Sequence, residues 1–158
     1  MKRSTLLVAV VLFGSLVASS QASATGTQQL RLELHDNLVC PVGFNLCGKG
    51  ELKGFGTVTT TLTFTGFGPG PGNCTALTGE RVVTLDSDGS TLRLSLVGVL
   101  CPQGNSLNAP GVGSGTYTVA GGTGQFAGAT GTGVLDVQAT GVPLPSDTAH
   151  YTGTLILP

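Results

Sequence analysis

The sequence predicts an all-β protein, built as a single antiparallel β-barrel of about eight strands, with a β-sandwich as the alternative architecture. Apolar and polar residues alternate with a period of two in one segment after another, and no segment carries a helical stripe. Glycine- and proline-rich turns separate these segments, as they do in barrels and sandwiches. The chain also contains four cysteines among its 158 residues, which favours a disulfide-stabilised domain.

The first 24 residues are expected to be a secretory signal peptide that is removed. Lys2 and Arg3 provide a positive start, residues 6–13 are an unbroken apolar run, and Ala22-Ser23-Ala24 supplies small residues before the cut. The apolar run is too short to span a membrane. We therefore expect a secreted, extracellular protein without a membrane anchor, whose mature part is one domain over residues 25–158.

Composition narrows the class of protein further. Apolar residues make up 40% of the chain and charged residues 9%, which is the opposite of the balance found in disordered chains. The net charge is −1, and lysine and arginine do not cluster anywhere. A nucleic-acid partner is not expected, because phosphates require a basic surface.

The N-terminal half begins with a strand in residues 30–35, where leucines alternate with charged or polar residues. Residues 48–53 are predicted to form a polar bend. Residues 57–65 alternate apolar side chains with threonines and form the next strand. Residues 66–72 contain two prolines and are predicted to be a loop, because proline cannot donate to a ladder.

A hairpin follows, formed by residues 81–86 and 91–100 around a turn that contains Asp88-Gly89. Asp-Gly is typical of a two-residue turn between antiparallel strands. Residues 102–113 are predicted to be a second long loop.

The hairpin helps to choose among the three pairings that four cysteines allow. It brings Cys74 and Cys101 within about one residue step of each other across the strands. Cys40 and Cys47 then remain to close a short loop. A zinc site is the rival interpretation, but the chain lacks closely spaced Cys-x2-Cys pairs, and no metal is expected.

The C-terminal part repeats the pattern with strands predicted at residues 115–120, 134–140 and 150–157, and a loop at residues 142–147. This makes seven strands, or eight if residues 126–130 pair as a short strand. The last strand ends at the end of the chain, and in a closed barrel it could lie beside the first strand.

A glycine-rich run joins two of these strands. Residues 121–133 hold six glycines, a single aromatic residue, Phe126, and no charge. Residues 122–127 fit a dinucleotide-binding pattern with alanine in the last position, but no helix follows to receive a pyrophosphate. We therefore expect no nucleotide, and no other cofactor.

The segment Tyr117-Thr118-Val119-Ala120-Gly121-Gly122-Thr123-Gly124-Gln125-Phe126-Ala127-Gly128-Ala129-Thr130-Gly131 resembles the Gly-Gly-Thr-Gly-x-Phe-x-x-Ala-x-Gly stretch of the dirigent and allene oxide cyclase-like barrels. The resemblance extends over about residues 113–141. It implies that the run joins neighbouring strands of an eight-stranded antiparallel barrel, with the phenylalanine packed into the wall. Members of that superfamily steer the coupling of phenoxy radicals or cyclise an unstable epoxide, and they hold an apolar substrate inside the barrel.

Dirigent proteins use acidic and basic residues that line the cavity. In this chain Arg31, Glu33, Arg93 and Asp136 alternate with residues suited to an apolar interior, so each is expected to face solvent. No catalytic residue of the family maps onto a matching position, and the catalytic residues stay unknown.

Three aromatic residues are the candidates for lining a ligand cavity: Tyr117, Phe126 and Tyr151. A tyrosine in an apolar cavity supplies one polar group to a ligand. The alternative is that these residues simply fill the core.

Four polar residues form a weaker candidate group. His35 and Asp36 would approach Asp147 and His150 if the first and last strands pair. Two imidazoles and two carboxylates could carry out acid–base chemistry or bind a metal. The alternative is that the histidines lie in solvent near strand ends.

The sequence therefore favours a secreted barrel that is not an enzyme and that binds a small apolar ligand or presents an interaction surface. The first alternative is a cyclase- or dirigent-like enzyme that guides an apolar substrate. The second is a self-associating structural protein, a homo-oligomer, because threonine- and glycine-rich strands leave edges free to pair. An internal void beside an acid and a base would favour the enzyme.

Overall fold

The chain folds into a closed antiparallel barrel of eight strands in which every strand pairs with its neighbours in sequence order. The structure is a computed structural model and describes residues 26–37, 40, 45–104, 109–140 and 146–158. The elements are β1 (Gly26–Asn37), β2 (Asn45–Leu52), β3 (Gly56–Pro69), β4 (Thr75–Leu85), β5 (Thr91–Pro102), β6 (Gly111–Gly122), the short 3-10 helix η1 (Gly124–Phe126), β7 (Thr132–Ala139) and β8 (Ser146–Leu157). The predicted barrel is confirmed, and the sandwich is excluded.

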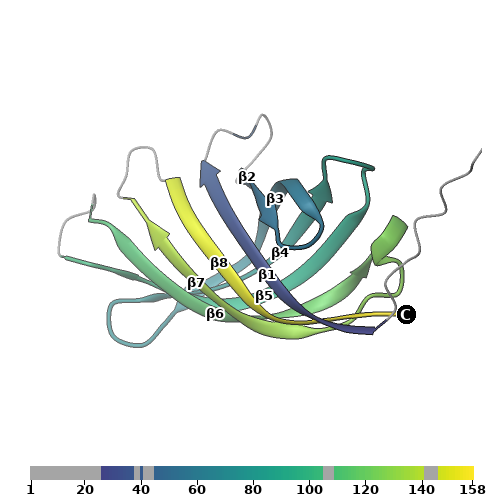
Figure 1. The fold of residues 1–158 in the computed structure, drawn as a ribbon. Coiled ribbons are helices and arrows are strands. Elements are labelled where there is room, and N and C mark those ends of the chain that lie inside the picture. The colour runs from purple at the N-terminus through teal and green to yellow at the C-terminus, as the bar shows by residue number, and fades with distance from the viewer. Residues whose placement is uncertain (1–25, 38–39, 41–44, 105–108, 141–145) are drawn as a thin grey trace, which may run out of the picture.

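Pairing between the first and last strands closes the barrel. β1 and β8 run antiparallel from Gly26 opposite Leu157 to Asn37 opposite Ser146. Figure 1 shows these strands side by side, β1 in dark blue and β8 in yellow. Their register defines two ends of the barrel. We call the end near Leu157 and η1 the closed end, and the end near Asn37 and Ser146 the open end.

The two-residue period of the strands separates the core from the surface. Leu30, Leu32 and Leu34 of β1 are almost completely buried, and the residues between them are exposed. The charged residues expected at the surface, Arg31, Glu33, Arg93 and Asp136, are all exposed. The apolar faces of the strands thus meet inside the barrel.

The predicted bend at residues 48–53 is wrong, because most of this segment belongs to β2. The strand pairs with β3 over its whole length and with β1 over residues 47–52. Its inward positions include Gly48 and Gly50, where a Cβ atom would lie 2.7 Å from the carbonyl oxygen of His35 or 2.8 Å from the side chain of Leu34. Without inward side chains at these two positions, the strand lacks the alternation on which the sequence prediction depended.

Parts of all three predicted loops belong to strands. β6 begins at Gly111, within the loop expected at residues 102–113. β3 continues through Gly66 to Pro69, with an irregularity in pairing between Phe64 and Gly66. A β-bulge inserts a residue without ending a strand. β8 begins at Ser146 instead of residue 150, which brings Asp147 into the sheet. Residues 126–130 do not form the eighth strand: Phe126 ends η1, and Thr130 makes one isolated bridge to Ile156.

The hairpin between β4 and β5 has a longer turn than the predicted two-residue turn. Thr84 pairs with Thr91, so the turn includes all of residues 86–89. In this register Cys74 and Cys101 are opposite each other just beyond the Thr75–Leu100 pair. Their disulfide, with Cα atoms 4.1 Å apart, confirms the predicted connectivity.

The second predicted disulfide, Cys40–Cys47, is also present, with Cα atoms 5.5 Å apart. Both disulfides lie at the open end, where β2 and β4 begin and β5 ends. The predicted signal peptide, residues 1–24, lies outside the described residues. Among the residues that the structure describes, none forms a helix long and apolar enough to cross a membrane.

The glycine-rich run connects β6 to β7 at the closed end through η1. Gly124 and Gly128 have φ angles of 58° and 74°, in the region that favours glycine. The turn inserts Phe126 into the barrel, where it is fully buried and packs against Phe55 with ring centroids 5.1 Å apart. Phe126 therefore fills the closed end.

Candidate functional site

The open half of the barrel contains an internal cavity of about 360 Å³. Its walls are almost entirely apolar and come from β2 to β8. The lining residues are Leu46, Leu62, Phe64, Phe67, Thr75, Leu77, Arg81, Leu96, Val97, Gly98, Val99, Leu100, Gly113, Ser114, Leu135, Val137, Ala139, Asp147 and Tyr151. The volume is within the range of small-molecule sites. The cavity is thus large enough for a small ligand.

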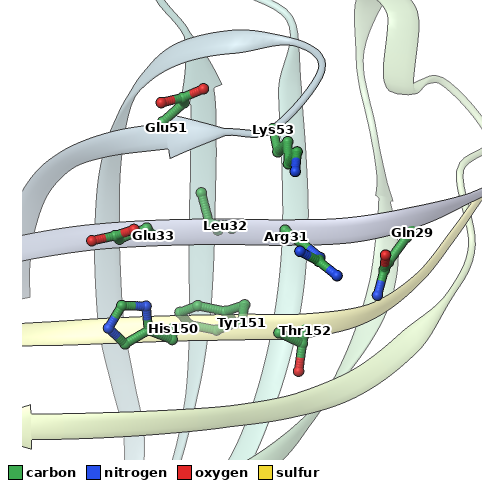
Figure 2. A pocket seen from close by; sticks show the side chains of 9 residues that line it. All are labelled: Gln29, Arg31, Leu32, Glu33, Glu51, Lys53, His150, Tyr151 and Thr152. Carbon is green, nitrogen blue, oxygen red and sulfur yellow. The ribbon is translucent and has the colours of Figure 1, made fainter.

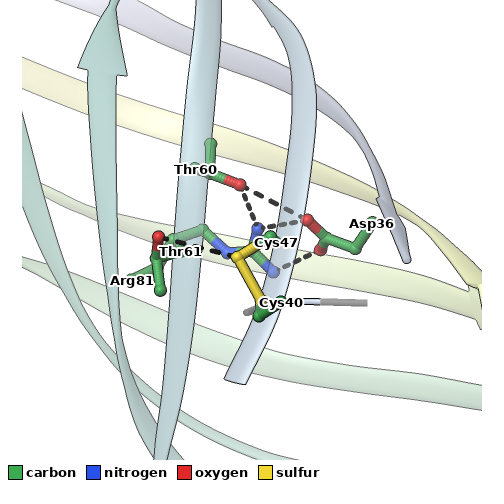
Figure 3. Close-up of a disulfide and its surroundings, with 6 residues drawn as sticks. All are labelled: Asp36, Cys40, Cys47, Thr60, Thr61 and Arg81. Atoms are coloured by element: carbon green, nitrogen blue, oxygen red, sulfur yellow. Dashed lines mark hydrogen bonds and ion pairs between the residues drawn. A yellow bond between two sulfur atoms is a disulfide. The ribbon is translucent and has the colours of Figure 1, made fainter. Parts of the chain in front are cut away.

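A buried ion pair lies at this cavity. Arg81 on β4 is 1% exposed, and its Nη1 and Nη2 donate hydrogen bonds of 2.9 and 2.6 Å to Oδ1 and Oδ2 of Asp36 on β1. Thr60 on β3 accepts a bond from Arg81 Nη1 at 2.9 Å and donates to Asp36 Oδ1 at 3.3 Å (Figure 3). The two-pronged geometry fixes both side chains, because a guanidinium matches both oxygens of a carboxylate.

Glycine on the neighbouring strand provides the space for this pair. Gly48 of β2 is opposite Asp36 in the register, and a Cβ atom there would collide with the carboxylate of Asp36. The Cys40–Cys47 disulfide lies beside the same position, as Figure 3 shows. Gly48, which interrupts the alternation pattern of β2 in the sequence, thus leaves space for the buried carboxylate of Asp36.

A second carboxyl group lies next to the first. Asp147 of β8 is directly opposite Asp36 of β1 and also lines the cavity. Burial, the charge of Asp36 and a hydrogen bond to it together raise the pKa of Asp147 to about 7, although Arg81 lowers it. Oδ1 of Asp147 is buried and has no hydrogen-bond partner. The cluster therefore contains two carboxyl groups and one guanidinium cation.

The predicted aromatic residues occupy three different places. Tyr151 lines the cavity, and the guanidinium of Arg81 lies 5.5 Å from the centre of its ring. Tyr117 packs against Tyr151 with ring centroids 5.7 Å apart but is not part of the lining. Burial raises the pKa of Tyr117 to about 12. Phe126 is at the closed end, away from the cavity.

The four polar candidates are divided between the two faces of the sheet. β1 and β8 do pair, but successive residues of a strand point to opposite faces. Asp36 and Asp147 face inward, whereas the side chain of His35 is 69% exposed and His150 is exposed. Within the described residues, no three histidine, cysteine or acidic side chains gather closely enough to hold a metal ion.

A second hollow, of about 600 Å³, lies over β1, β2 and β8 (Figure 2). It is bordered by charged residues of both signs, Arg31, Glu33, Glu51 and Lys53, and by His150. The strands themselves form its floor, with Leu32 and Tyr151 buried beneath. Its lining is mostly charged or polar, so the apolar internal cavity is the better candidate for a site that takes an apolar ligand.

Arg81 is the residue that sequence reasoning missed. It occupies an inward position of a strand whose inward residues also include Leu77, Val83 and Leu85. A charge in phase with buried apolar residues is unusual, because an unpaired buried charge is very costly. The sequence could have revealed Arg81 because it alternates in step with the apolar residues of its strand. The predicted strand begins at residue 81, however, so no earlier residue showed which face Arg81 occupies.

The cluster can hold or transfer a proton beside an apolar cavity. It can also bind a polar group through Asp147 Oδ1, an acceptor, or Arg81 Nε, a donor that likewise has no partner. Comparison of the chain with models of known families, with curated proteins and with solved structures finds no match. The geometry of the cavity is therefore the basis for a functional assignment.

Proposed function

We propose that the protein binds a small, mainly apolar molecule in the open half of the barrel, with the ligand's polar end at Asp147 and Arg81. One observation carries this proposal: an apolar cavity of about 360 Å³ beside two buried polar atoms that have no partner. Buried polar groups are normally paired, so a ligand that satisfies them would gain affinity.

The direct test is binding of a neutral fluorescent probe, N-phenyl-1-naphthylamine, whose emission rises in apolar surroundings. Ala139 lines the cavity, and its neighbour Gln138 is exposed. We expect Ala139→Phe to fill the cavity and abolish binding, and the matched Gln138→Phe to bind as the unaltered protein does. Equal binding by the two variants would place the probe on the outer surface and contradict the proposal.

Acid–base catalysis on such a ligand is the second candidate function. It is favoured by Asp147, because a carboxyl group with a pKa of about 7 can both donate and accept a proton at neutral pH. The reaction class would be isomerisation or cyclisation of an apolar substrate, with Asp147 as the acid or base. Substrate turnover that follows a single ionisation near pH 7 and is lost in Asp147→Asn would support catalysis.

We further propose that the protein is secreted and is related to the dirigent and allene oxide cyclase-like barrels. Two disulfides are typical of proteins that fold in oxidising compartments. The position of the glycine-rich run between neighbouring strands of an eight-stranded barrel supports the relationship. N-terminal sequencing of the exported protein, expected to begin at Thr25, tests secretion.

A further inference from the structure

We propose that the ligand of the internal cavity is an apolar amine, bound as its ammonium ion against Asp147. This inference rests on the proposed ligand-binding function and adds the charge of the ligand. It follows from the arrangement of three side chains. Asp36 and Asp147 are inward carboxyl groups on paired strands, and the guanidinium of Arg81 donates hydrogen bonds to both oxygens of Asp36.

The cluster lacks one positive charge. With both aspartates ionised, Asp36 and Asp147 carry two negative charges, and Arg81 supplies one positive charge. Arg81 is committed to Asp36 by two hydrogen bonds, so Asp147 has no counterion of its own. A buried carboxylate without a partner is strongly disfavoured. In the free protein a proton fills this role, and a ligand ammonium would replace the proton.

The surroundings of Asp147 supply no other cation among the described residues. Asp36 is its neighbour on β1, and uncharged Ala139 is opposite on β7. Tyr151 on the same strand, Tyr117 on β6 and Arg81 on β4 are the remaining titratable groups of the cluster. Of these only Arg81 is positive at neutral pH.

The same arrangement disfavours anionic ligands such as fatty acids. A ligand carboxylate would be the third negative charge beside a single guanidinium. An ammonium group instead offers hydrogen atoms to Asp147 Oδ1, which is buried and has no partner. Arg81 Nε, a second cavity atom without a partner, donates, so a neutral oxygen on the same ligand would satisfy it as well.

The experiment compares three probes that share one chain and differ in charge: octylamine, 1-octanol and octanoate. Binding to the purified, disulfide-intact protein is measured by isothermal titration calorimetry at pH 5 to 9. At pH 8 we expect octylamine to bind more tightly than 1-octanol, and octanoate not to bind. Because the proton and the ammonium compete, octylamine affinity should fall about 100-fold between pH 8 and pH 5, with uptake of the ligand releasing about one proton at pH 6.

Two variants test the assignment to Asp147. Asp147→Asn keeps the shape of the side chain but removes its charge, so it should bind octylamine no better than octanol, without pH dependence. Asp136→Asn alters an exposed carboxylate on β7 and should behave as the unaltered protein does. At pH 8, octanol or octanoate binding as tightly as octylamine would overturn the amine assignment alone. Failure of all three probes to bind would overturn the ligand-binding function itself.

Discussion

Replacing Asp147 with asparagine should stabilise the protein above neutral pH, and the gain can be worked out from the carboxyl cluster. The pKa of Asp147 is about 7 in the folded protein, against an ordinary value of 3.8 for the carboxyl group in an unfolded chain. The folded state therefore binds a proton that the unfolded state releases. The stabilisation linked to this proton is complete below pH 4 and is lost as the pH rises through 7.

A difference of about 3 pKa units corresponds to about 4 kcal/mol, at 1.36 kcal/mol per unit. In the Asp147→Asn variant an uncharged amide would lie beside Asp36, and no group at this position would have to ionise. The free energy of unfolding of the variant, measured relative to that of the unaltered protein, should thus rise by about 4 kcal/mol as the pH is raised from 3 to 8. With a urea dependence of about 2 kcal/mol/M, this corresponds to a relative shift in midpoint of about 2 M.

The assay is urea unfolding followed by circular dichroism at pH 3, 5, 7 and 8.5, with the disulfides intact. Asp136→Asn serves as the control, because Asp136 is exposed on the outer face of β7. An equal change in stability at every pH in Asp147→Asn would contradict this prediction, because the effect would then come from the shape of the side chain and not from its charge. The prediction also fails if the Asp136 variant shows the same pH dependence.

Three further substitutions test the packing around the site and at the closed end. Arg81→Met leaves two facing carboxyl groups without a cation and should cost about 3–5 kcal/mol at pH 8 but much less at pH 4, as measured by urea unfolding. Gly48→Ala places a methyl group against Asp36 and should cost about 1–3 kcal/mol, whereas Gly68→Ala, with open space around it, should have little effect on the unfolding midpoint. Phe126→Ala empties the closed end and should cost about 3–5 kcal/mol in the same assay, and a loss below about 1 kcal/mol would show that η1 is not packed as described.

Sequence reasoning reached the architecture because the strands follow a simple rule. Where an inward residue is apolar and an outward one is polar, as in β1 and β5, alternation locates the strand. It failed at β2, where glycines at inward positions leave no alternation to read. Proline within residues 66–72 suggested a loop, but Pro69 is the terminal residue of β3, where the ladder ends and proline is tolerated.

The candidate site could be predicted only in part from the sequence. Pairing of the first and last strands predicts that Asp36 and Asp147 lie close to His35 and His150. Adjacent residues of a strand point to opposite faces of the sheet. The carboxyl groups of Asp36 and Asp147 therefore lie inside the barrel, and the imidazoles of His35 and His150 lie outside it. Arg81 comes from a strand distant from both and could be placed only once the barrel had closed.

The two disulfides lie at the open end, where the cavity leaves the barrel least filled. The closed end is held by packing around Phe126, whereas atoms facing the cavity lack contacts on one side. Covalent cross-links limit how far strands can separate where such contacts are missing. Reducing conditions would therefore loosen the wall of the internal cavity before the packed end of the barrel, so the proposed ligand binding would be lost before the fold itself is.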